Sequence, residues 1–252
     1  MKLICKVNAA AIPTVEPQFL LNSALQRIPL FRLERIPANF KNANTCRFIV
    51  DENNNVVALV SDKFRLTQPR EVINSLISPF VNELHSWKIY YGAGVVAARF
   101  VFNKLIELDD IHVRPGILLF DSVTKQYKLK IVAAPLVQEC GNELLLRKAA
   151  FSRKHIGMIR TDLRRFIAEF KEWLYNLSML KVMKDRMQKE AIDKETFNNI
   201  LSDLKLPSKY VENLKWCDGY TLWNLYMDLT RRLTAFEAPL QYHVRVAKLV
   251  GV

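Results

Sequence analysis

The chain has 252 residues, half of them hydrophobic, so it can bury a core and form one large domain or two small ones. This composition excludes a disordered chain, and the formal net charge of +12 indicates a polyanionic or acidic partner. No apolar run approaches the roughly 18 residues of a membrane-spanning helix, so we expect no membrane partner. The four cysteines are scattered without a CxxC pair, which favours reduced thiols and a cytoplasmic protein.

The first half of the chain has the pattern of short strands separated by turns. Pairs of apolar segments flank turn-forming residues and predict three hairpins, at 46–50 with 56–60, 86–91 with 94–102, and 116–120 with 127–133. Segments 17–26 and 69–77 begin with proline, which suits a first helical turn, and predict helices. In the last strand Lys128 and Lys130 alternate with apolar residues, so we expect one basic sheet face.

From residue 159 onward the apolar residues change to helical spacing and predict an amphipathic helix that extends to residue 180. Further helices are predicted at 193–204, 208–217 and 219–236. We therefore predict an α+β fold, with an antiparallel-rich sheet domain over 1–146 and a mostly helical C-terminal domain or cap over 147–252. The apolar stripe consists of Ile159, Leu163, Phe166, Phe170, Trp173, Leu177 and Leu180.

Positive charge is concentrated between residues 147 and 189. This segment contains 12 basic residues and four acidic ones, which gives it a local net charge of +8. At about 100° per residue, Arg160, Arg164 and Lys171 form one stripe beside the apolar face of the predicted helix. These three have no acid three or four residues away, whereas Arg165 has Asp162 and Glu169 at that spacing. An uncompensated row of like charges indicates a phosphate-binding surface more than an ordinary solvated face.

The basic track extends onto the preceding segment if Gly157 marks the start of the helix. His155 lies among basic residues, which favour its neutral form and hydrogen bonding over acid catalysis. Base stacking on a sheet could come from Tyr90, Tyr91, Tyr127 or Trp87, although core packing is the simpler interpretation of each. The predicted nucleic-acid-binding residues are Arg147, Lys148, Arg153, Lys154, His155, Arg160, Arg164, Lys171, Lys128 and Lys130.

No catalytic signature competes with this interpretation. The four histidines show no metal-ligand spacing, and no phosphate-loop, dinucleotide-binding or nucleophile-elbow motif is present. We expect no cofactor, no metal and no catalytic residue, so the sequence favours a binding protein over an enzyme. Glu107, Asp109 and Asp110 leave open a magnesium-dependent nuclease, against the simpler interpretation of an exposed acidic loop.

Several segments, taken in order, resemble the phage- and plasmid-borne proteins grouped as domain of unknown function 932. They are the strand, aromatic and helix segment at 56–76 with Phe64, the hairpin and cysteine–asparagine motif at 116–144 with Cys140 and Asn142, the segment 151–157 ending near His155, and the segment 221–234 with Trp223, Tyr226 and Thr230. The arginine that begins the cysteine–asparagine motif is replaced in this chain. The resemblance implies a DNA-transaction role, such as single-strand annealing or recombination, and no catalytic residue is carried over.

The leading hypothesis is a phage-like nucleic-acid-binding protein that favours single-stranded DNA, binds with little sequence preference and acts in the cytoplasm of a host cell. It is compatible with a homo-oligomer. The alternative is a viral structural or protein-interaction module without enzymatic activity. For that alternative Trp216, Trp223 and Tyr226 are candidate interface aromatics.

Overall fold

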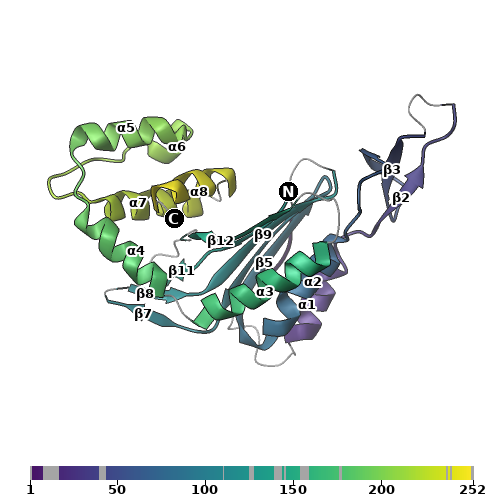
Figure 1. Cartoon of the computed structure of the whole chain (residues 1–252), viewed down its shortest axis with the longest axis horizontal. Coiled ribbons are helices and arrows are strands. Elements are labelled where there is room, and N and C mark those ends of the chain that lie inside the picture. The colour runs from purple at the N-terminus through teal and green to yellow at the C-terminus, as the bar shows by residue number, and fades with distance from the viewer. Residues whose placement is uncertain are drawn as a thin grey trace. The chain divides into compact units, whose positions relative to one another are not determined.

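Strands dominate the first half of the chain and helices the second (Figure 1), in a computed structural model. The structure describes residues 2–7, 17–39, 44–109, 111–124, 128–138, 144, 146–153, 159–175, 178–236, 238 and 240–250. The predicted α+β fold, an antiparallel-rich sheet region followed by a mostly helical C-terminal region, is confirmed.

The strands, in chain order, are β1 (Lys2–Val7), β2 (Phe31–Arg35), β3 (Cys46–Asp51), β4 (Val56–Ser61), β5 (Leu84–Gly92), β6 (Val95–Phe102), β7 (Ile106–Leu108), β8 (Ile111–Arg114), β9 (Gly116–Ser122), β10 (Leu129–Ala133), β11 (Leu136–Val137) and β12 (Leu146–Arg153). The helices are α1 (Pro17–Leu25), α2 (Pro69–Ile77), α3 (Ile159–Tyr175), α4 (Ser178–Lys189), α5 (Lys194–Leu204), α6 (Ser208–Val211), α7 (Leu222–Ala235) and α8 (Leu240–Val246), with 3₁₀ helices η2 (Ser78–Glu83) and η3 (Ala247–Val250).

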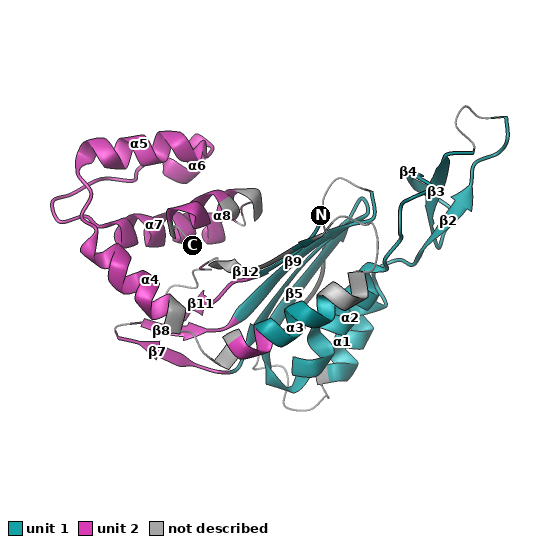
Figure 2. Cartoon of the chain, in the orientation of Figure 1, with its two compact units in different colours: residues 1–103, 116–132, 150–169 teal, residues 104–115, 133–149, 170–252 magenta. Residues whose placement is uncertain are grey.

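The chain divides into two compact units and crosses between them several times (Figure 2). Unit 1 consists of residues 1–103, 116–132 and 150–169, and unit 2 of residues 104–115, 133–149 and 170–252. The single predicted boundary after residue 146 differs from this division. The hairpin β7–β8 is inserted between β6 and β9, and both β12 and α3 begin in one unit and end in the other.

The main sheet of unit 1 has the strand order β1-β5-β6-β9-β10-β12. β5 pairs antiparallel with β6, which confirms the predicted hairpin at 86–102, and β9 and β10 are neighbours, as the hairpin at 116–133 requires. On one face of this sheet the central strands bury most of their side chains, with Trp87, Ile89, Phe100 and Leu119 among them. A sheet face is buried in this way only where another layer covers it, and Figure 1 shows α1, α2 and α3 gathered on one side of the strands.

Both helices predicted from their leading prolines are present, α1 from Pro17 and α2 from Pro69. α2 also carries Glu71 in its first turn, where an acid is favoured by the exposed N–H groups. Its apolar face buries Val72, Ile73 and Leu76, and the helix packs against β9 and α1. Local sequence signals and tertiary burial therefore agree in this layer.

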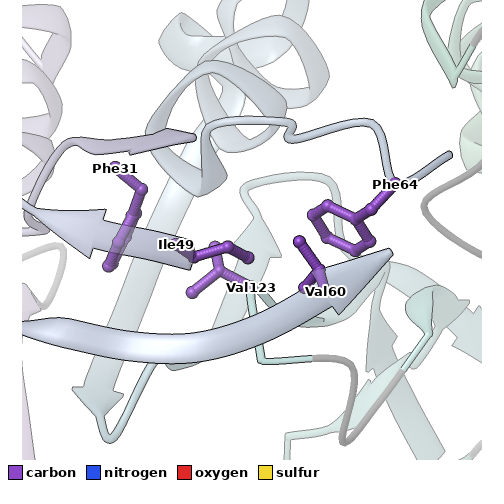
Figure 3. Close-up of a cluster of buried hydrophobic side chains, with 5 residues drawn as sticks. All are labelled: Phe31, Ile49, Val60, Phe64 and Val123. Atoms are coloured by element: carbon purple, nitrogen blue, oxygen red, sulfur yellow. The ribbon is translucent and has the colours of Figure 1, made fainter. Parts of the chain in front are cut away.

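A second, three-stranded sheet of unit 1 has the order β2-β3-β4 and confirms the predicted hairpin at 46–60. Its turn uses Asn54 in the left-handed region, at a φ of +64°, as the Asn-rich sequence predicts. The inner face buries Phe31, Ile49, Val60 and Phe64 against Val123, which follows β9 (Figure 3). This cluster fixes the small sheet to one end of the main sheet.

Unit 2 contains the sheet β11-β8-β7 and most of the C-terminal helices. α5 begins at Asp193, whose side chain accepts a hydrogen bond from the Thr196 backbone N–H, and α7 begins with a capping box between Thr221 and Asn224. α7 packs against α4, α6 and α8 and buries Leu225, Tyr226 and Leu229 completely. The amphipathic patterns of α4, α7 and α8 thus contribute to one helical core.

Two predicted helices differ from the structure. The stripe over 159–180 is divided between α3, which ends at Tyr175, and α4, which begins at Ser178. The predicted helix at 208–217 consists only of the four residues of α6, because Glu212 leaves the helical region with a ψ of +143° and Asn213 follows in the left-handed region at a φ of +64°.

Candidate nucleic-acid interface

The second face of the main sheet carries half-buried charged and aromatic residues among buried apolar ones such as Val101 and Leu118. Register places Lys88 of β5 opposite Arg99 of β6, and Arg99 opposite Leu118 of β9. Residues directly opposite in an antiparallel pair lie on the same face, so these positions form one row across three strands. Both basic residues are half-buried, and Lys6 of β1 occupies the register position next to Lys88. The row therefore brings three basic positions together on adjacent strands.

A second row on the same face is aromatic. Tyr90 of β5 lies opposite Ala97 of β6, which lies opposite Phe120 of β9. All three are half-buried. Two strand spacings separate the two aromatic positions by about 10 Å, with a small side chain between them. Aromatic rings on a sheet face are the usual platforms on which unpaired bases stack, and these two rings are partly accessible.

The strand β10 adds lysine to this face. Lys130 is half-buried between the fully buried Leu129 and Ile131, so alternation places it away from the helix-covered side. Lys128, just before the strand, is exposed. The positions that β5, β6, β9 and β10 contribute to this face include no acid; the one acid of these four described strands, Asp121, lies on the covered face and is buried. We call Lys88, Tyr90, Arg99, Phe120 and Lys130 the charged sheet face.

The predicted stripe on α3 is partly described. Leu163, Phe166 and Phe170 are buried, as the apolar spacing predicts, and Arg164 and Lys171 are exposed. Arg165 forms the expected pair with Glu169, with Nε 2.9 Å from Oε1, whereas Arg164 and Lys171 have no ion pair within the described part of the chain. For Arg160 the structure gives the backbone position in α3 alone. Arg164 belongs to unit 1 and Lys171 to unit 2.

The other predicted residues divide between the units in the same way. Arg147 and Lys148 lie in the part of β12 that belongs to unit 2, and Arg153 ends that strand in unit 1. Lys154 and His155 lie outside the described residues. Within unit 1 the alternation along the strands places Lys130 on the same face as Lys88 and Arg99, two residues that sequence reasoning did not select. Lys88 and Arg99 alternate in sequence with the apolar residues Trp87, Ile89 and Phe100, which could have indicated that they lie on the opposite face. Only the strand register shows that Lys88 and Arg99 are neighbours.

The four aromatic residues considered for base stacking lie in different parts of the chain's structure or outside the described residues. Trp87 is buried in the covered face, and Tyr91 packs in the cluster beneath the small sheet, with its ring centroid 6.4 Å from that of Phe31. Burial raises the pKa of the Tyr91 hydroxyl. Tyr127 lies outside the described residues. Of the four candidates, Tyr90 is the described one on the charged sheet face, and Phe120 joins it there.

The acidic segment before β8 has a structural role in unit 2. Asp109 accepts hydrogen bonds from Lys181, at 3.1 Å, and from the buried Lys184, at 3.5 Å. The hydrogen bond from Lys181 is the main cause of a lowered pKa of the Asp109 carboxyl. Glu107 instead lies 3.8 Å from His112, and Asp110 lies outside the described residues. Among the described residues no group of three His, Cys, Asp or Glu could hold a metal ion.

Two of the three interface aromatics expected for an interaction module lie in the core, and the third is half-buried. Trp223 and Tyr226 are buried in α7, with ring centroids 6.0 Å apart, and Thr230 donates its hydroxyl to the Tyr226 carbonyl. Trp216 is half-buried and donates its indole N–H to the Ile192 carbonyl at 2.7 Å. Phe64 is likewise buried. The family-like positions that the structure describes therefore stabilise the fold.

No protein-family model, no curated protein and no solved structure matches this chain. In the part of the chain that the structure describes, no helix is both long enough and apolar enough to cross a membrane. These comparisons therefore give no support to a function or to the resemblance to domain of unknown function 932. Both must be argued from the residues of this chain.

Proposed function

We propose that the protein binds single-stranded nucleic acid, with DNA favoured, through the charged sheet face. The observation that carries the proposal is the pair of adjacent rows, Lys88 with Arg99 and Tyr90 with Phe120, on a sheet face without acids in its described strands. Lysine and arginine side chains at adjacent positions of a sheet can contact the phosphate backbone of a bound strand. The aromatic row would stack bases of any sequence, so binding is sequence-tolerant.

This activity fits a role in strand annealing or recombination, which is also what the resemblance to domain of unknown function 932 implies. An annealing protein must hold strands without reading them, and stacking together with phosphate contacts provides that. The scattered cysteines support a cytoplasmic location. Mixing labelled complementary oligonucleotides with the protein would show whether annealing follows binding.

The binding test compares two charge-reversal variants of equal net charge. Lys88→Glu with Lys130→Glu alters the charged sheet face, and Lys194→Glu with Lys215→Glu alters exposed positions in unit 2. Each Lys→Glu substitution removes two charges, so both double variants have a formal net charge of +8 instead of +12. We expect the first variant to lose at least about tenfold in affinity for a labelled single-stranded oligonucleotide, and the second to lose much less.

A third variant, Arg164→Glu with Lys171→Glu, tests the predicted stripe on α3 in the same titration. The proposal predicts that it behaves like the control in unit 2. An equal loss in all three variants would show that only the total charge matters, and a loss confined to the α3 variant would place binding on the helix. Either result contradicts the proposal for the sheet face.

A further inference from the structure

The small sheet β2-β3-β4 ends in a pair of arginines that face each other. Register places Arg35, the last residue of β2, directly opposite Arg47 of β3. Both side chains are exposed. Opposite residues on neighbouring antiparallel strands have Cα atoms about 4.5–5.5 Å apart and lie on the same face, so two guanidinium groups share one small area.

These two arginines differ from the third arginine of the sheet. Arg32 donates to Glu34, at 2.7 Å, to the Asp51 carbonyl and to the Asn54 side chain, so its charge is used within the fold. Among the described residues, the side chains of Arg35 and Arg47 have no hydrogen bond and no ion pair. The arginine at one end of the sheet is therefore structural, and those at the other end are available to an external anion.

Further basic residues lie at the same end. The Asp62 backbone N–H donates to the Thr45 carbonyl at 2.9 Å, which brings the segment after β4 next to the start of β3. This segment carries the exposed residues Lys63 and Arg65 against one acid, Asp62. The sequence from residue 35 to residue 50 contains Arg35, Lys41 and Arg47 and no acid at all. We call Arg35, Arg47, Lys63 and Arg65 the basic end of the small sheet.

We propose that the basic end is a second nucleic-acid-binding surface, which contacts phosphates and is separate in its residues from the charged sheet face. The inference rests on the proposed function for the identity of the partner. Three of the four residues are arginines, whose planar guanidinium groups bind a phosphate with two parallel hydrogen bonds. A nucleic-acid strand repeats this charge at every nucleotide, so it matches a row of arginines better than the scattered acids of a protein surface do.

The test is the salt dependence of binding. Each phosphate contact contributes about 0.7 to the slope of log K against log salt for a single strand and about 0.9 for a duplex. We expect Arg35→Ala with Arg47→Ala to reduce the magnitude of the slope by about 1.4 for a single-stranded oligonucleotide if the basic end holds a single strand, or by about 1.8 for a duplex if it holds duplex. The control, Lys194→Ala with Lys215→Ala, removes the same charge and should leave both slopes unchanged.

Thermal unfolding excludes a trivial loss of structure. Because the arginine pair repels, the Arg35→Ala with Arg47→Ala variant should have a Tm equal to or above that of the parent. Slopes equal to the parent's for both nucleic acids, in a parent that does bind, would overturn this inference alone and leave an acidic protein as the partner to seek. A parent that binds neither nucleic acid would overturn the proposed function as well.

Discussion

Lys184 shows at the scale of single residues how a charge can be buried in unit 2. Its side chain is 1% exposed, and its ammonium group donates to the Leu108 carbonyl at 3.1 Å and lies 3.5 Å from the Asp109 carboxylate. A buried ammonium is stable only where such partners replace water. Lys181 adds an exposed contact to the same carboxylate at 3.1 Å. Asp109 therefore links α4 to the β7–β8 hairpin.

The contacts of Asp109 with Lys181 and Lys184 predict that the stability of the protein depends on pH. Because the pKa of Asp109 is lower in the folded protein, chiefly through the hydrogen bond from Lys181, the carboxylate stabilises the fold above its ordinary pKa of about 3.9 and loses that effect as the pH falls through the folded value. Asn at position 109 cannot titrate, and it tolerates the left-handed φ of +54° found there. We expect the Tm difference between the parent and Asp109→Asn to be largest near about pH 6 and to shrink below about pH 4. A difference that stays constant over this range would contradict the assignment.

At the scale of elements, the turn between β5 and β6 of the main sheet packs against the small sheet of unit 1. Ala93 and Gly94 have φ values of +50° and +72°, and a Cβ on Gly94 would lie 2.6 Å from Thr124 Cγ2 and 3.0 Å from Val57 Cγ1. The small sheet approaches the main sheet closely at this point, because Val57 packs against the same buried cluster. Glycine is required here for its backbone and for its size.

A matched pair of substitutions separates these two requirements. Gly219 also has a positive φ, of +77°, but nothing lies within 4 Å of a Cβ added there. We expect Gly219→Ala to lower the free energy of unfolding by about 1 kcal/mol through the backbone alone. Gly94→Ala should cost about 1–3 kcal/mol more, because the new methyl group overpacks the junction. Urea unfolding measures both, and equal losses would show that the close approach contributes nothing.

Several elements were predictable because their signals are local. The hairpins at 46–60 and 86–102 combine alternating apolar residues with turn residues, and α2, α5 and α7 carry recognisable first turns. β2 was not predicted, because "FRLER" contains three charges in five residues and forms a strand only by pairing with β3. Because β2 was not predicted, nothing in the sequence indicated that Arg35 would lie opposite Arg47.

At the scale of the whole molecule, the sequence reveals the sum of the charges better than their arrangement. The predicted concentration of charge between 147 and 189 is real, yet its described residues divide between two units. Lys88, Arg99 and Lys130 are 11 and 31 positions apart in sequence, so no helical or strand period relates them. Strand pairing across the sheet brings them onto one face, and pairing between distant segments cannot be obtained from local patterns.

The central claim, that the charged sheet face holds single-stranded nucleic acid, is tested most directly by photo-crosslinking. An oligonucleotide with a photoreactive base at successive positions would be irradiated in complex with the protein, and the attached peptides would be mapped by mass spectrometry. Bases stacked on the aromatic row should attach to Tyr90 in β5 or Phe120 in β9. Crosslinks confined to α3 or to unit 2, in a complex that forms normally, would contradict the account.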